Sequence, residues 1–325
     1  MAPLILNRLA QSIFVMLAVG IIAFSLFRFV GDPVAQMVGQ ETSIEDQERL
    51  REELGLNDAV PVQFVRFVKN MVTGEFGFSY RTRQPIGELI KSRLPATIEL
   101  AFVSLIISLI AGIPAGIYTA IHPNRKTSSA LLLVTLIGVS LPTFVIGISL
   151  IYLFGVQLAW LPTFGRGDTV EFGWWKSNFF TVDGWRALIL PALTLGLYQL
   201  TLTMRLVRSE MQEVLRTDYL NFAIARGLSW RSIYYRHALK NTMVPVVTII
   251  GLQFGGIIAF AIVTESVFQW PGLGLLFLES IQFVDIPVMS VYLILIALLF
   301  VIVNLIVDIL YILIDPRIRV SGAKG

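Results

Sequence analysis

Two polar side chains near the C-terminal end of the chain could do chemistry inside an otherwise apolar stretch. Asn304 and Asp308 lie in the apolar run 288–314, and a spacing of four places them on one face of a helix. If this run crosses a membrane, the carboxylate must face protein or water. Asp308 could then belong to a proton or ion path, or the pair could form a polar contact between helices near the cytoplasmic end.

Two single amides offer a second place where polar chemistry could occur. Gln199 and Gln253 each stand in a mainly apolar stretch. They could line a translocation path, or they could simply bond across helices. Proton-driven transporters use several buried ionisable groups, and these stretches offer essentially only Asp308. The sequence therefore disfavours a pump that powers itself, such as an ion-coupled secondary transporter.

The usual catalytic and metal-binding patterns are missing from the sequence. There is no cysteine, and the two histidines are His122 and His237. No Gly-x4-Gly-Lys-Ser/Thr phosphate loop occurs, nor a His-Glu-x2-His zinc motif, nor a Gly-x-Ser-x-Gly nucleophile turn. We therefore predict no catalytic residues, no metal site and no cofactor in this chain, and no enzyme activity of its own.

The composition indicates a membrane protein. Of 325 residues, 55% are hydrophobic and 14% are charged, against about 25% charged in soluble domains. A membrane-spanning helix needs about 20 mostly apolar residues. We predict an all-α membrane protein with six transmembrane helices, at roughly residues 9–30, 98–121, 130–154, 187–206, 243–264 and 288–314.

The charges in the loops predict the orientation. With the N-terminus inside, Lys and Arg outnumber acids in the inside segments, acids outnumber bases outside, and the loop 265–287 has no Lys or Arg. This is the positive-inside pattern, so both termini of this multi-pass protein are predicted to be cytoplasmic. A secretory signal peptide is the alternative for the first stretch, but no small-x-small cleavage site follows it, which favours a retained helix.

The chain divides into three predicted parts: residues 1–30 with the first span, an extracytoplasmic segment 31–97, and a core 98–325. Within the second part, Ser43 and the acids after it predict a short helix that ends at Gly55, and 63–72 predicts another. Four tryptophans in the outside segment 155–186 indicate an interfacial aromatic belt or, alternatively, a partner-binding surface; they are Trp160, Trp174, Trp175 and Trp185.

The inside segment 205–242 is too long for a simple turn and is basic and amphipathic. Gly227 interrupts it, and Ser229 is a candidate N-cap for the next helix. Such a segment could bind anionic headgroups, could merely enforce topology, or could dock a cytoplasmic protein. Nucleic acid is not expected as a partner because no reader motif is present.

The segment from Tyr219 to Leu228, Tyr-Leu-Asn-Phe-Ala-Ile-Ala-Arg-Gly-Leu, is followed by His237-Ala-Leu-Lys-Asn241 and Pro245. It resembles the cytoplasmic loop of ABC importer permeases, specifically the B-type subunit of the oligopeptide/dipeptide permease group. Asn221 and Phe222 depart from the general Glu-Ala-Ala pattern in the manner of that group. Similar motifs follow in order along nearly the whole chain: Gly31–Val34, Glu53–Leu56, Gly74–Gly77, Ala96–Leu100, Glu265–Gly274 and Asp315–Arg319.

The resemblance implies a type I ABC importer permease fold in the bacterial cytoplasmic (inner) membrane. It also implies a passive gate whose energy comes from partner subunits. It implies a second homologous permease subunit, two ABC ATPase subunits that use ATP and Mg, an extracytoplasmic substrate-binding protein, and membrane lipid as partners. The expected cargo is di- or oligopeptides, with nickel, glutathione or another small solute as alternatives. The loop would hold a coupling helix whose contact residues are Asp218, Tyr219, Ala223, Ala225, Arg226, Gly227 and Arg231, with Ala223 and Ala225 allowing close approach and the arginines meeting acidic groups.

Overall fold

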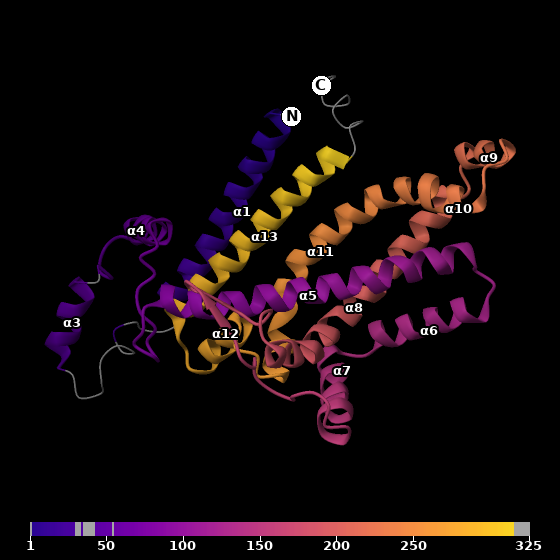
Figure 1. The fold of residues 1–325 in the computed structure, drawn as a ribbon. Helices are drawn as coiled ribbons and strands as arrows, with labels where there is room; N and C mark the ends of the chain where they lie inside the picture. Colours follow the sequence, from indigo (N-terminus) through magenta and orange to yellow (C-terminus); the bar gives the residue numbers. More distant parts are fainter. Residues whose placement is uncertain (1, 30–33, 35–42, 54, 315–325) are drawn as a thin grey trace.

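In a computed structural model, residues 2–29, 34, 43–53 and 55–314 are described, and they form helices and one two-stranded hairpin (Figure 1). The long apolar elements are α1 (Ala2–Phe29), α5 (Ile86–Ile121), α8 (Val182–Val214), α11 (Leu239–Val267) and α13 (Ile286–Ile314). The third predicted span is divided into α6 (Lys126–Ser140), α7 (Thr143–Leu150) and a π-helical turn η1 (Ile151–Gln157). The shorter elements are α3 (Ile44–Glu53), α4 (Val60–Thr73), β1 (Val170–Phe172), β2 (Trp175–Ser177), α9 (Asp218–Ala225), α10 (Trp230–Ser232), the π-helical turn η2 (Ile233–Ala238) and α12 (Leu273–Gln282).

Small residues allow α5 and α8 to pack along much of their length. Ser104, Ser108, Gly112 and Gly116 are four apart and buried, so they form one stripe along α5. A Cβ placed on Gly116 would lie 2.7 Å from the Cβ of Val207. Ser104 contacts Gly196, and further along both helices Gly116 contacts Val207. Because residue numbers increase in the same direction in both helices, α5 and α8 run parallel.

This parallel arrangement decides how many times the described chain crosses the membrane. Five single helices are long and apolar enough to span it, and α6 with α7–η1 forms a pair bent by 108°. Since α5 and α8 run in the same direction, the chain between them must cross back. The bent pair is therefore the sixth crossing, in agreement with the prediction of six spans.

The third span differs from the uninterrupted helix predicted over 130–154. The chain leaves helical geometry at Leu141, and Pro142 precedes α7 with an extended ψ of 140°. Proline excludes helical geometry from the residue before it and donates no backbone hydrogen bond. Pro142 accounts for the break, across which the two helical pieces are bent by 108°. A Cβ on Gly147 would lie 3.2 Å from Phe268, so α7 approaches the end of α11 closely.

The first and last spans, α1 and α13, lie side by side and antiparallel (Figure 1). Arg8 Nε lies 3.0 Å from Asp308 Oδ2 near one end, and Ser290 donates to the carbonyl of Ala23 at 3.1 Å near the other. The start of α1 and the end of α13 are therefore on the same side of the membrane, as predicted for the two termini.

The short helices predicted between the first two spans are present. Ser43 accepts a hydrogen bond from the backbone of Asp46 at 3.1 Å and begins α3, and α4 contains the predicted segment 63–72. Phe24 of α1 packs edge-on against Phe64 of α4, with ring centroids 5.4 Å apart. The next helix, α5, begins at Ile86, ahead of the expected boundary at residue 97, because its first turns are polar and extend beyond the apolar run.

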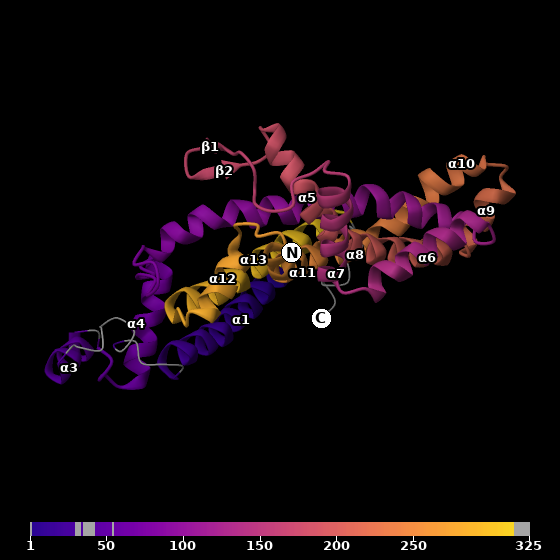
Figure 2. The ribbon, with the colours of Figure 1, turned by 90° about the horizontal axis from the view of Figure 1, so that it is seen from below.

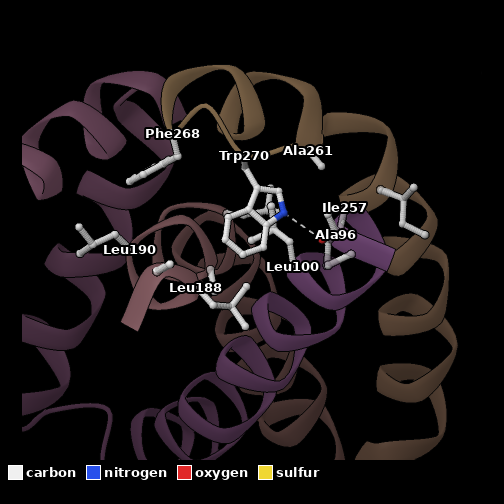
Figure 3. Packing of buried hydrophobic residues seen from close by; sticks show 13 residues of the cluster. Ala96, Leu100, Leu188, Leu190, Ile257, Ala261, Phe268 and Trp270 are labelled. Atoms are coloured by element: carbon white, nitrogen blue, oxygen red, sulfur yellow. Dashed lines mark hydrogen bonds between the residues drawn. The ribbon is translucent and has the colours of Figure 1, made fainter. Parts of the chain in front are cut away.

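A buried core joins α5, α8 and α11 to the segment that follows α11 (Figure 3). Trp270 lies at its centre with no exposed surface, and its indole N–H donates to the carbonyl of Ala96 at 3.0 Å. Leu100 of α5 and Leu188 of α8 are also fully buried here. The indole thus fills the space among three spans.

Candidate coupling loop and buried polar contacts

The candidate coupling loop lies at the end of the molecule where α8 finishes and α11 begins (Figures 1 and 2). The helix α8 continues to Val214, beyond its apolar part, and α9 follows after a short turn. Then come α10 and η2, which lead into α11. The basic segment thus forms two short helical pieces joined at Gly227, as predicted.

Gly227 ends α9 in a Schellman motif. Its φ is +74°, a conformation that glycine adopts without strain. The N–H of Gly227 donates to the carbonyl of Ile224 at 2.9 Å, and that of Leu228 donates to Ala223 at 3.3 Å, which is the paired bonding of this motif. Ser229 then accepts from the backbone of Ser232 at 3.4 Å and caps the next helix, as the sequence indicated.

The buried side of α9 packs against α8 and η2 of the same chain. Leu220 has no exposed surface, and Ala223 is 5% exposed. Both belong to a cluster with Met211 of α8 and with Ile233 and Ala238 of η2. Ala223, which was expected to face a partner, instead faces the interior of this chain.

The opposite side of α9 is exposed, as are most of the residues expected at a contact. Asp218, Tyr219, Ala225, Arg226, Gly227 and Arg231 are all exposed. The Tyr219 hydroxyl lies 2.8 Å from Nδ1 of His237, which ties α9 to η2. The Arg226 guanidinium lies 5.8 Å from the ring centroid of Phe222.

Two aromatic residues on this surface were not among the expected contact residues. Phe222 is 64% exposed on α9, and Trp230 is 57% exposed on α10. Large exposed rings in a basic setting are the side chains that anchor protein interfaces. The sequence did contain a signal for Phe222 as a contact residue, because this phenylalanine replaces a small alanine of the general importer pattern.

The two amides predicted to line a path are brought together. Gln199 of α8 donates through Nε2 to Oε1 of Gln253 on α11. Gln199 is buried and Gln253 is half-buried. The contact joins the two helices, which is one of the two roles the sequence left open.

Asn304 and Asp308 have different surroundings in spite of their shared helix face. Asp308 pairs with Arg8 of α1, at the exposed end of both helices. Asn304 Oδ1 is buried and has no hydrogen-bond partner among the described residues. The predicted interhelical polar contact is therefore present for Asp308, with Arg8 as a partner that the sequence did not identify.

A buried ion pair fixes the outside segment to α5, and sequence reasoning missed it. Arg166 donates to Glu99 Oε2 at 3.0 Å, and the two side chains are 8% and 2% exposed. Glu99 also accepts from the indole of Trp175 and from the backbone of Asn178, each at 3.0 Å. Burial lowers the pKa of the Arg166 guanidinium, while the hydrogen bond and charge of Glu99 act in the opposite direction.

A second buried carboxylate holds the start of α12. Glu265 has no exposed surface; it accepts from the Thr97 hydroxyl at 2.6 Å and from the Leu275 N–H at 3.0 Å. Thr97 in turn accepts from the Leu273 N–H at 2.8 Å. A Cβ on Gly274 would lie 2.6 Å from Cα of Ile262. These contacts explain why this part of the Glu265–Gly274 motif requires a carboxylate and small residues.

The segments before α5 and after α12 are also joined. Asp285 accepts from the Ser79 hydroxyl at 2.5 Å and from the Tyr80 N–H at 3.1 Å. Arg81 lies 3.1 Å from Glu279 and packs over the ring of Phe283 at 3.8 Å. Parts of two predicted outside segments therefore form one continuous surface.

Six crossings, buried polar contacts between spans and an amphipathic loop at one end define a multi-pass membrane protein. The family profile described as "Binding-protein-dependent transport system inner membrane component" matches residues 112–320, and the N-terminal profile of the same component matches residues 1–101. The chain belongs to this family of ABC importer permeases. It is an inner-membrane permease subunit and not itself a catalyst, and membership implies ATPase and binding-protein partners.

Relatives are similar along nearly the whole chain. The dipeptide transport system permease protein DppB of Alkalihalophilus pseudofirmus is 36% identical, covering 97% of this chain and 98% of its own length. A probable peptide ABC transporter permease protein of Sinorhizobium fredii is 39% identical, covering 98% of this chain and all of its own. The glutathione transport system permease protein GsiC of Escherichia coli is 36% identical over 97% of this chain and 98% of its own.

A solved structure shares the fold. The MetNI methionine ABC transporter, in inward-facing conformations, matches with a TM-score of 0.53 and 16% identity. The match covers 68% of this chain and 93% of that chain. The fold is therefore that of an ABC importer permease.

Proposed function

We propose that this chain forms half of a translocation pathway for di- or oligopeptides, together with a second homologous permease subunit and two ABC ATPase subunits. The observation that supports peptides as the cargo is the full-length similarity to dipeptide and peptide permeases. The Lys and Arg distribution supports both termini and α9 on the cytoplasmic side. The outside segment 31–97, joined to the loop after α12 through Asp285, would then meet the substrate-binding protein.

We propose that the exposed side of α9 and α10 contacts an ATPase subunit. Through this contact, the conformational change that accompanies ATP hydrolysis would be transmitted to the membrane helices. Exposed aromatic rings and arginines suit a groove with apolar walls and acidic rims on an ATPase subunit. On the buried side, Leu220 packs with Met211 of α8 and Ile233 of η2. A displacement of α9 would therefore move the ends of two spans, and nucleotide would favour one of two global arrangements of the permease.

Gly227→Pro tests this assignment. Proline cannot adopt the φ of +74° and lacks the N–H that bonds to Ile224, so we expect loss of uptake and of substrate-stimulated ATP hydrolysis in the reconstituted complex. Gly227→Ala is the matched control: it keeps the N–H, has open space for the new methyl group, and costs only about 1–2 kcal/mol of backbone strain. Unchanged coupling in an assembled Gly227→Pro complex would contradict the coupling role.

The cargo needs its own experiment, because similar permeases serve different solutes. GsiC is named as a glutathione permease, and it is as similar to this chain as DppB is, at 36% identity. Glutathione is itself a small peptide. We expect mass spectrometry of ligand retained by the purified complex with its binding protein to show di- or oligopeptides. Recovery of nickel or of glutathione alone would replace the peptide proposal without affecting the coupling proposal. Uptake by the isolated chain with an ion gradient and no ATP would instead indicate a secondary transporter.

A further inference from the structure

The β1–β2 hairpin lies beside α5 (Figure 2). The hairpin and the residues after it carry exposed aromatic side chains. Phe172, Trp174 and Phe180 are each more than half exposed. Phe172 and Phe180 face each other with ring centroids 4.8 Å apart. The hairpin is fixed in this place at its base by the buried Arg166–Glu99 pair. The aromatic surface is therefore held in a defined position relative to a membrane span.

A groove of about 330 Å³ lies between the hairpin and α5. Its walls are Ile98 and Phe102 from α5 and Phe172, Phe179 and Phe180 from the other side. This volume falls at the lower end of the range of about 300–1,000 Å³ for ligand pockets. The size and the walls suit part of a flexible apolar ligand.

The polar groups at the groove already have partners within the chain. Both carboxylate oxygens of Glu99 accept hydrogen bonds, and the indole N–H of Trp175 is one of the donors. The hydroxyl of Ser177 accepts from the Phe179 N–H at 3.2 Å. A peptide strand placed here would bury backbone N–H and C=O groups without partners, at a cost of about 1–3 kcal/mol for each. Hydrocarbon has no such cost.

The groove opens beside an exposed, apolar side of α5. This helix has 36 residues, about 54 Å at 1.5 Å per residue, whereas the hydrocarbon core is about 30 Å thick. Its apolar run begins at about residue 98, so the hairpin contacts α5 at the membrane edge. Phe102, at the groove, and Ile110, two turns further along, are both exposed on the same helix. Aromatic rings concentrate at this level of a membrane.

We propose that this groove holds an acyl chain of a membrane phospholipid and that the hairpin's exposed rings lie in the interfacial layer beside it. The bound chain would cover the apolar walls that the protein itself leaves open. The ion pair between Lys176 and Glu171, 2.7 Å apart and exposed on the hairpin, would remain on the aqueous side. This inference depends on α5 being a membrane span, and it does not depend on the cargo.

The test uses the full complex reconstituted in phosphatidylcholine vesicles that contain phosphatidylcholine with a diazirine on one acyl chain. After irradiation, peptide mass spectrometry should find label at Phe102, Phe172 and Phe180, as well as at the control position Ile110, an exposed residue of the apolar part of α5. The double variant Phe172→Asp, Phe180→Asp should lose most of the label at Phe102 relative to Ile110. Phe164→Asp, a change at an exposed ring that does not line the groove, should keep it.

The wild-type labelling decides the matter even if the double variant fails to fold. Label at Ile110 without label at the hairpin overturns the proposal. A photoreactive amino acid placed at Phe172 in the same complex tests the alternative: its cross-linking to the binding protein or to the second permease subunit, in place of lipid, also overturns the proposal and identifies a protein interface.

Discussion

Arg166→Ala should destabilise the protein by about 3–5 kcal/mol, because it leaves the buried carboxylate of Glu99 without its counter-charge. The two side chains are 8% and 2% exposed, so water cannot replace the lost partner. Trp175 and the Asn178 N–H still donate to Glu99, but neither supplies a charge. Thermal denaturation of the complex in detergent, followed by tryptophan fluorescence, measures the loss.

The destabilisation in Arg166→Ala should arise because Glu99 is left as an unpaired buried charge, and not because the ion pair itself contributes much net stability. The double variant Glu99→Gln, Arg166→Met removes both charges, and we expect it to recover part of the stability lost in Arg166→Ala, as replaced buried pairs do. Arg166→Lys keeps the charge but loses the geometry that reaches Glu99, Asn178 and the Lys176 carbonyl together, so it should rescue incompletely.

A surface pair on the β1–β2 hairpin provides the control. Lys176 lowers the pKa of the Glu171 carboxyl, chiefly by its hydrogen bond, yet both side chains are well exposed. Lys176→Ala should change the stability far less than Arg166→Ala, because solvent screens the pair. Equal losses from the two variants would show that burial does not set the energy of the Glu99–Arg166 pair.

The spans and the turn at Gly227 could be predicted from the sequence because their signals are local. Twenty apolar residues in a membrane must satisfy their own backbone bonds, and the turn at Gly227 needs only a glycine and the bonds of adjacent residues. The capping by Ser43 and Ser229 follows the same logic. For such elements, tertiary structure adds little that the adjacent sequence does not already determine.

The buried ionic contacts could not be predicted because their partners are distant in the sequence. Glu99 and Arg166 are 67 residues apart, and Arg8 and Asp308 come from opposite ends of the chain. One general signal was available: an acid at the edge of an apolar run, such as Glu99, is costly unless it is paired. That signal requires a partner but does not identify it. Likewise, Pro142 explains why the third span is interrupted, but a proline alone does not determine the 108° angle between the two pieces.

The Glu265–Gly274 motif shows a further limit. The sequence identified it by resemblance alone, whereas the structure gives its residues physical roles. Glu265 stabilises the first turn of α12, where backbone N–H groups have no helical partners. Trp270 fills the space between spans, and Gly274 permits close approach to Ile262. The motif therefore positions α12 against α5 and α11, which is a structural role within the gate.

Trp270→Ala should destabilise the protein by about 3–5 kcal/mol, the range for removal of a large buried side chain. Trp270 is fully buried, and its loss would leave a cavity among α5, α8 and α11 (Figure 3). Because these three helices are spans of the transport unit, we also expect uptake to fall while the basal ATP hydrolysis of the partner subunits continues. Denaturation midpoints and uptake in the same reconstituted complex check both outcomes.

The variant Trp270→Phe separates the contribution of side-chain volume to stability from that of the hydrogen bond to Ala96. Phenylalanine keeps most of the apolar contact but leaves the Ala96 carbonyl without the indole donor, so its loss should be nearer the 1–3 kcal/mol of an unsatisfied buried polar group. Trp174→Ala removes an exposed indole of the same size and should leave the stability in detergent nearly unchanged. If Trp270→Ala proved as mild as Trp174→Ala, the helices would not depend on this core, and the motif would need a different explanation, such as direct contact with cargo.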